Sequence, residues 1–147
     1  MSVSRKLESD VLDALARTVL SDLPDAVIYA DRDGNVRFWN AGAERIFGFT
    51  QSEANDRSLD IIIPERLRKR HWDGYRHMME TGHSSHASDE LLAVPAVTKT
   101  GESLSIQFTV APVRNAAGTL TGIVSVLRDV TTTFRELKRL RAQASAR

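Results

Sequence analysis

His71 stands in a segment whose spacing would place an imidazole among apolar side chains. Leu67, His71, Tyr75 and Met78 follow one another at intervals of four, four and three, so they share one face of a helix. A neutral imidazole nitrogen in dry surroundings is the ligand that a heme iron takes. The spacing therefore favours a cofactor site with His71 as the metal ligand.

The opposite face of the same segment is predicted to be polar, because Arg70, Asp73, Gly74 and His77 fall on it. A single histidine on an apolar helix face is more often an ordinary core residue than a metal ligand. Large neighbours such as Trp72 could also fill a pocket rather than line it. The spacing alone leaves a ligand pocket and a packed core both open.

The helix that carries His71 is predicted to span residues 65–81. Pro64 suits a helix start, and Gly82 suits a helix end. Before it, two β-rich runs at 26–30 and 36–40 flank a turn containing Gly34, which predicts a hairpin. Asn40 is a suitable N-cap for the helix that follows, and Thr50 with Glu53 predicts a capping box for another.

Three further strands are predicted at residues 91–97, 104–110 and 120–127. Strict alternation of apolar and polar residues marks the second, whereas Pro95 in the first indicates a sheet edge or a bulge. Two strands, several short helices and three strands predict an α+β domain, with a five-stranded antiparallel sheet and helices on one face. Such layers can enclose a pocket for a small ligand.

Amphipathic helices are predicted on both sides of this domain, at residues 4–22 and 130–144. Their apolar positions recur every three or four residues: Leu7, Val11, Leu15 and Val19 in the first, and Val130, Phe134, Leu137 and Leu140 in the second. Such a stripe could pack on its own domain or build a coiled coil with a second chain. The pattern does not decide between the two.

Composition excludes several kinds of chemistry. The 147 residues contain no cysteine, so disulfides, thiolate metal sites and cysteine–flavin photochemistry are excluded. The motifs of hydrolases, phosphate loops and dinucleotide-binding enzymes are absent, and we expect no enzyme activity. A net charge of +1 and the lack of a signal core or a long apolar run predict a cytoplasmic protein without nucleic-acid or membrane partners.

Residues 23–131 resemble a PAS domain. The resemblance rests on the opening LPDAVIYADRDGNVRFWNAGAERIFGFTQSEA, the IIIPE element, the helix ending in METG, the TKTGESLSIQFTVAPVRNAAGTLTGIVSVLRDVT hairpin, and the exit Asp129-Val130-Thr131. It implies the PAS fold and a role in sensing and signal transduction. It also implies three parts: an N-terminal helix at 1–22, the sensor domain at 23–131 and a signalling helix at 132–147. By the same resemblance, Glu44 and Lys99 would form a helix–sheet salt bridge.

The segment from Ile63 to His71 also resembles the rhizobial heme-PAS oxygen sensors of the FixL type. This implies heme b with His71 as the iron ligand, and basic residues such as Arg70 as partners of the propionates. Leu92 occupies the position where those sensors carry an arginine for bound oxygen, which would bias sensing toward CO or NO. The implied cofactor contacts are Leu67, His71, Tyr75, Met78, Leu92, Ile106, Phe108 and Val110.

Two functional classes remain open at this level. One is a ligand sensor, with heme b and gas or redox sensing as the first hypothesis and a small metabolite as another. The other is a cofactor-free dimerisation and relay module, with a homodimer formed through the flanking helices. Either would act on a downstream effector domain or a partner protein.

Overall fold

A computed structural model describes residues 7–83 and 92–146 of the chain. Five strands form one antiparallel sheet in the order β2-β1-β5-β4-β3. The strands are β1 (Ala26–Asp31), β2 (Val36–Trp39), β3 (Leu92–Val97), β4 (Ser103–Arg114) and β5 (Leu120–Asp129). This confirms the predicted α+β class, and β3 with Pro95 does lie at a sheet edge.

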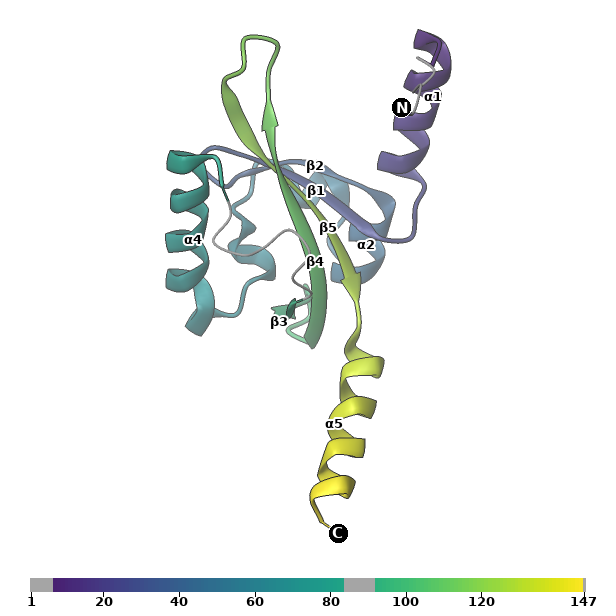
Figure 1. Cartoon of the computed structure of the whole chain (residues 1–147), viewed down its shortest axis with the longest axis vertical. Coiled ribbons are helices and arrows are strands. Elements are labelled where there is room, and N and C mark those ends of the chain that lie inside the picture. The colour runs from purple at the N-terminus through teal and green to yellow at the C-terminus, as the bar shows by residue number, and fades with distance from the viewer. Residues whose placement is uncertain (1–6, 84–91, 147) are drawn as a thin grey trace, which may run out of the picture.

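Helices connect the two groups of strands and pack beside the sheet (Figure 1). They are α2 (Ala41–Phe47), α3 (Gln51–Ala54), the 3-10 turns η1 (Leu59–Ile62) and η2 (Glu65–Leu67), and α4 (Arg68–Thr81). The helix predicted at 65–81 thus starts as a 3-10 turn and becomes α-helical at Arg68. It ends as predicted at Gly82, whose backbone φ of 73° is one that residues other than glycine rarely adopt.

Local capping fixes the ends of the short helices. The Asn40 side chain accepts a hydrogen bond from the backbone of Ala43, and Thr50 forms the predicted capping box with Glu53. The predicted salt bridge between Glu44 and Lys99 is wrong. Lys99 pairs with Glu53 and holds the pKa of that carboxyl down at about 2, while Glu44 accepts a hydrogen bond from the backbone of Gln51.

The interior has two regions with different packing. In the packed half, beneath α2 and α3, the buried Trp39 ring contacts the buried rings of both Phe47 and Phe49. In the hollow half, Tyr75 and Met78 of α4 pack in one cluster with Ile123 of β5, and a cavity lies beside them between α4 and the sheet. Both regions share the central strands, so the difference lies in the helices that cover them.

Two helices project away from the sheet (Figure 1): α1 (Ser9–Ser21) and α5 (Thr131–Ser145). Neither contains a buried residue, so the interpretation that α1 packs on its own domain is wrong. The exposed apolar residues include Leu7, Val11, Leu12, Leu15, Val19, Leu20 and Leu23 on and around α1, and Phe134, Leu137 and Leu140 on α5. Among the described helices, none is long and apolar enough to cross a membrane.

Candidate ligand-binding site

A cavity of about 500 Å³ lies between α4 and the sheet. Its size falls within the range of roughly 300–1,000 Å³ that is common for small-molecule pockets. Most of its lining is aliphatic, and the polar side chains that reach it are few. The lining residues are Ile28, Leu59, Ile62, Ile63, Leu67, Arg70, His71, Gly74, Tyr75, Met78, Ala93, Val94, Pro95, Ala96, Ile106, Phe108, Val110, Ile123, Ser125 and Leu127.

The structure brings seven of the eight predicted contact residues together at this cavity: Leu67, His71, Tyr75, Met78, Ile106, Phe108 and Val110. The eighth, Leu92, lies in β3 with its backbone opposite Phe108, but its side chain lies outside the described part of the chain. Their contact with a ligand stays a prediction.

The prediction that Arg70 and Gly74 lie on a polar face turned away from the pocket is wrong, because both line the cavity. The stripe that faces the cavity runs through Leu67, His71, Gly74 and Met78. Because the space beside α4 is a cavity and not a packed layer, residues at the margins of the apolar stripe also border it. His77, by contrast, is exposed to solvent as predicted.

The imidazole of His71 is uncharged at neutral pH, and one of its two nitrogens lacks a hydrogen bond. Its buried Nδ1 has no hydrogen-bond partner among the described residues. Burial lowers the pKa of His71 to about 4, against a smaller opposing effect of the Asp60 carboxylate. At neutral pH the ring therefore carries a free nitrogen lone pair, which is the form that binds a metal or accepts a hydrogen bond.

Trp72 lies beside His71, with ring centroids 4.6 Å apart in an edge-to-face arrangement. Its indole nitrogen donates a hydrogen bond to the Asp60 carboxylate at 2.7 Å. Its ring lies against Gly34, where an added Cβ would stand 2.1 Å from the indole. Trp72 therefore does not fill the cavity. It fixes α4 against the β1–β2 turn and so positions the neighbouring His71.

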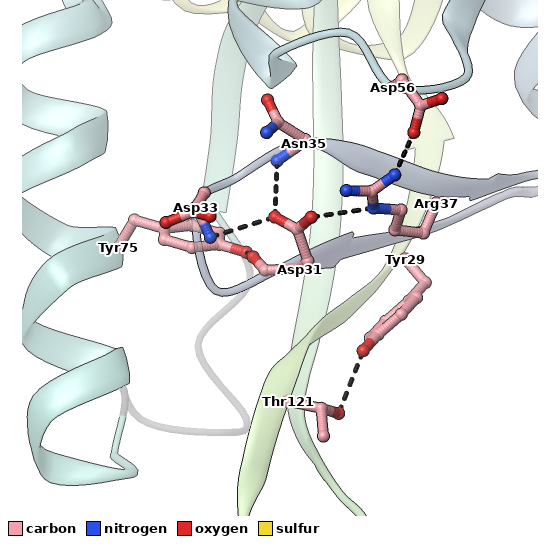
Figure 2. Close-up of polar contacts among 8 residues, drawn as sticks. All are labelled: Tyr29, Asp31, Asp33, Asn35, Arg37, Asp56, Tyr75 and Thr121. Carbon is pink, nitrogen blue, oxygen red and sulfur yellow. Dashed lines mark hydrogen bonds and ion pairs between the residues drawn. The ribbon is translucent and has the colours of Figure 1, made fainter.

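Tyr75 makes the second contact between α4 and this turn. Its hydroxyl donates to the backbone carbonyl of Asp31, which leaves its ring to line the cavity. Burial raises the pKa of Tyr75 well above its usual value. Figure 2 shows the Asp31 carboxylate accepting from the backbones of Asp33 and Asn35 and from the Arg37 side chain. The turn that receives Tyr75 is thus held rigidly by its own hydrogen bonds.

Sequence reasoning missed one polar side chain on the sheet wall. Ser125 lines the cavity from β5, between Ile123 and Leu127 along the strand and opposite Ile28 and Val110 on the neighbouring strands. The residue is only half-buried, and its hydroxyl is not among the buried polar atoms that lack a partner. The alternation Ile123, Ser125, Leu127 in the sequence is the signal that could have identified it.

The fold agrees with comparisons to known proteins. The PAS fold family matches residues 20–135, so the chain belongs to the PAS family. The PAS domain of a protein from Colwellia psychrerythraea superposes with a TM-score of 0.72 at 18% identity, over 84% of this chain and 99% of that one. At this identity the superposition shows the fold alone.

Two curated sequences are similar to parts of the chain. The sensor protein FixL of Bradyrhizobium diazoefficiens is 36% identical over 70 residues, which cover 48% of this chain and 14% of that protein. An uncharacterized protein of Azorhizobium caulinodans is 33% identical over 135 residues, covering 90% of this chain and 18% of that protein. The chain therefore spans less than a fifth of the length of either relative.

Proposed function

We propose that this PAS sensory domain binds heme b in the cavity, with His71 as the iron ligand, for gas or redox sensing. The observation that carries the proposal is the buried Nδ1 of His71, which has no partner among the described residues. A buried polar nitrogen without a hydrogen bond costs free energy, and a ligand in the adjoining cavity could offset this cost.

The other residues of the cavity fit this cofactor. The pKa of His71, lowered to about 4, keeps the imidazole able to bind a metal at neutral pH. Arg70 lines the cavity and could pair with a propionate. Arg68 and Lys69 are less suitable, because Arg68 donates to the carbonyls of Ile63 and Asp60 and Lys69 pairs with Asp73.

The sheet wall supports a particular preference among gases. Ile106, Phe108 and Val110 line it, and no charged side chain of the described sheet residues reaches the cavity. Leu92 stands in β3, where the resemblance to heme-PAS oxygen sensors predicts an arginine. A diatomic ligand would find little polar stabilisation there, which favours CO or NO over oxygen.

A path from the cavity to the output helix is present in the sheet. β5 lines the cavity and continues through Val130 into α5. The backbone of Val130 donates to the carbonyl of Ser105 at 2.9 Å, and the Thr131 hydroxyl accepts from the Ser105 backbone at 2.9 Å. A ligand that shifts β5 against β4 would thus move α5. We propose that α5 acts on a downstream effector domain or a partner protein.

The second candidate function is a cofactor-free dimerisation and relay module. The exposed apolar stripes of α1 and α5 favour it, because such surfaces normally pack against a partner. A homodimer through these helices, as a coiled coil, is compatible with either candidate. For both we propose a cytoplasmic domain without catalytic activity or a nucleic-acid partner, and a small metabolite remains the alternative occupant of the cavity.

Titration of the purified protein with hemin, followed by absorbance, tests the heme proposal. The wild-type protein should give a saturable Soret band typical of histidine-ligated heme. His71→Ala should lose that band, whereas His77→Ala, which changes an exposed histidine on the same helix, should keep it. Absence of a saturable band in the wild type, or an unchanged band in His71→Ala, would contradict the proposal.

A further inference from the structure

The helices α1 and α5 are attached to the same end of the sheet and point in opposite directions (Figure 1). Ala26, which begins β1, lies opposite Leu127 near the end of β5, so the end of α1 and the beginning of α5 adjoin neighbouring strand ends. Neither helix contains a buried residue. The apolar faces of the two helices therefore do not cover each other within one chain.

Each of the two helices, counted with its N-cap residue, contains a seam of four residues that is apolar except for one charged end. The α1 seam consists of Glu8, Leu12, Leu15 and Val19, and the α5 seam consists of Val130, Phe134, Leu137 and Arg141. Successive residues of both seams are four, three and four positions apart, which is the heptad spacing of residues that face a partner helix in a coiled coil. This spacing reads the same in either direction, so the two seams also match residue by residue when the helices run antiparallel.

The charged ends decide between the possible pairs of seams. In an antiparallel pair of α1 with α5 of a second copy, Glu8 faces Arg141 and the other three layers are apolar. These layers are Leu12 with Leu137, Leu15 with Phe134, and Val19 with Val130. A parallel pair of two like helices would place Glu8 against Glu8 or Arg141 against Arg141, which is repulsive. The remaining arrangements place each charge against a valine, so opposite charges meet only in the antiparallel pair of α1 with α5.

The net charges and lengths of the two helices agree with this pairing. Residues 8–22 carry four carboxylates and one arginine, a net charge of −3, whereas residues 131–145 carry four basic side chains and one glutamate, a net charge of +3. Electrostatic attraction thus acts between α1 and α5, and repulsion acts between two copies of either helix. The 13 residues of α1 and the 15 residues of α5 span similar lengths, about 20 and 22 Å.

A single two-fold axis would form two such pairs at once. Because both helices are attached to one end of the sheet, a two-fold rotation near that end lays α5 of the second copy along α1 of the first, and the reverse. The chain runs toward the sheet in α1 and away from it in α5, so each pair is antiparallel. An interface of this kind is closed, and it covers both apolar seams of both copies.

We propose that two copies of this chain form an antiparallel dimer in which the α1 seam of each copy packs along the α5 seam of the other. This inference rests on the homodimer through the flanking helices that is part of the proposed function. It adds which helix binds which, their relative direction and the residues in contact. In this dimer the two α5 helices point away from each other, so they form no parallel coiled coil with one another.

Disulfide trapping tests the pairing directly, because the chain contains no cysteine of its own. Leu12→Cys and Leu137→Cys are prepared as separate proteins, mixed and oxidised. We expect a covalent dimer with one copy of each variant in the mixture, identified by its mass, and no covalent dimer from either variant alone. Ala14→Cys, on the opposite face of α1, is the matched control and should not cross-link with Leu137→Cys.

Sedimentation of the wild type separates the failure of this inference from the failure of the homodimer. A covalent dimer from Leu12→Cys or Leu137→Cys alone would show two like helices in contact, which overturns the antiparallel pairing and leaves the homodimer in place. A dimeric wild type without a covalent product in the mixture would do the same. A wild type that sediments as a monomer at every concentration would overturn both.

Charge exchange at the ends of the seams is the second test, measured as the dimer dissociation constant by sedimentation equilibrium. Glu8→Arg should weaken the dimer by about tenfold, because it places like charges together at two symmetric contacts. Arg141→Glu should do the same, and the double variant should return to within about threefold of the wild type. Asp10→Arg makes the same charge change on the far face of α1 and should weaken the dimer by less than about threefold. Equal effects of Glu8→Arg and Asp10→Arg, or no recovery in the double variant, would overturn the inference.

Discussion

The packed half and the hollow half of the interior differ in whether their buried polar side chains are hydrogen-bonded. In the packed half, the Trp39 indole donates to the Phe49 carbonyl at 2.9 Å. The Asn40 side chain accepts from the backbones of Val27 and Ala43 at 2.8 and 2.9 Å and donates to Asp25 at 3.0 Å. In the hollow half, the buried Nδ1 of His71 has no hydrogen-bond partner among the described residues.

This difference separates residues that serve the fold from residues that serve a ligand. Both halves lie on the same sheet and are covered by helices of the same domain, so sheet geometry does not explain it. Natural proteins satisfy almost all buried polar groups, and exceptions concentrate at functional sites. The contrast within one small domain is therefore the main argument that the cavity is a binding site.

Phenylalanine truncation should show the largest difference between the halves. Phe47 is fully buried, and Phe47→Ala should cost about 4 kcal/mol of unfolding free energy, because it opens a new cavity in a closed core. Phe108 is only partly buried and borders space that is already empty, so Phe108→Ala should cost about half as much. Urea unfolding of both variants measures this, and equal costs would contradict the division into two halves.

The pH dependence of stability should show the burial of His71. Its folded pKa of about 4 lies below the unfolded value, so the unfolded state binds more protons between about pH 6.5 and pH 4. Stability is therefore fully present above pH 6.5 and falls as the pH drops through this window. The loss from this group is on the order of 3 kcal/mol, from a shift of about 2.5 pKa units.

Urea unfolding across this pH range in the wild type and in His71→Gln isolates the effect, because all other titrating groups cancel in the difference. The variant should lose less stability on acidification than the wild type. His77→Gln, which changes an exposed histidine, should follow the wild-type curve. Parallel curves for the wild type and His71→Gln would show that His71 is not buried in solution.

Removal of one polar side chain from each half should also change the unfolding free energy unequally, with smaller effects than the phenylalanine truncations. Asn40→Ala removes the partner of two buried backbone N–H groups, those of Val27 and Ala43, and should cost about 2 kcal/mol. Ser125→Ala changes a residue that is only half-buried, so the stability of the unliganded protein should change by less than about 0.5 kcal/mol. Thermal or urea unfolding of both variants measures this, and a cost at Ser125 that matches Asn40 would indicate a hydrogen bond within the protein.

Elements that depend on local residue chemistry could be predicted from the sequence. The β1–β2 hairpin follows from its turn residues, the capping box follows from Thr50 and Glu53, and the edge position of β3 follows from Pro95. These features need only neighbouring residues to form, so their signals lie within a few positions of the chain.

Features that depend on the surroundings of an element could not be predicted in the same way. Helical periodicity gives the direction of each side chain but not how wide a sector the cavity uncovers, so Gly74 and Arg70 were placed on the wrong face. The partner of Lys99 depends on how α3 sits against the sheet, which residue spacing does not determine. Ser125 was missed because a single serine in a strand has no distinguishing pattern.

Chemical rescue of His71→Gly tests the central claim most directly, that His71 presents a free nitrogen to a ligand in the hollow half. Hemin is added to the variant with and without imidazole, and the absorbance spectrum is recorded. The account predicts no histidine-type Soret band for the variant alone and recovery of the wild-type band when imidazole replaces the missing side chain. A wild-type band in the variant without imidazole, or no band in the wild type, would contradict it.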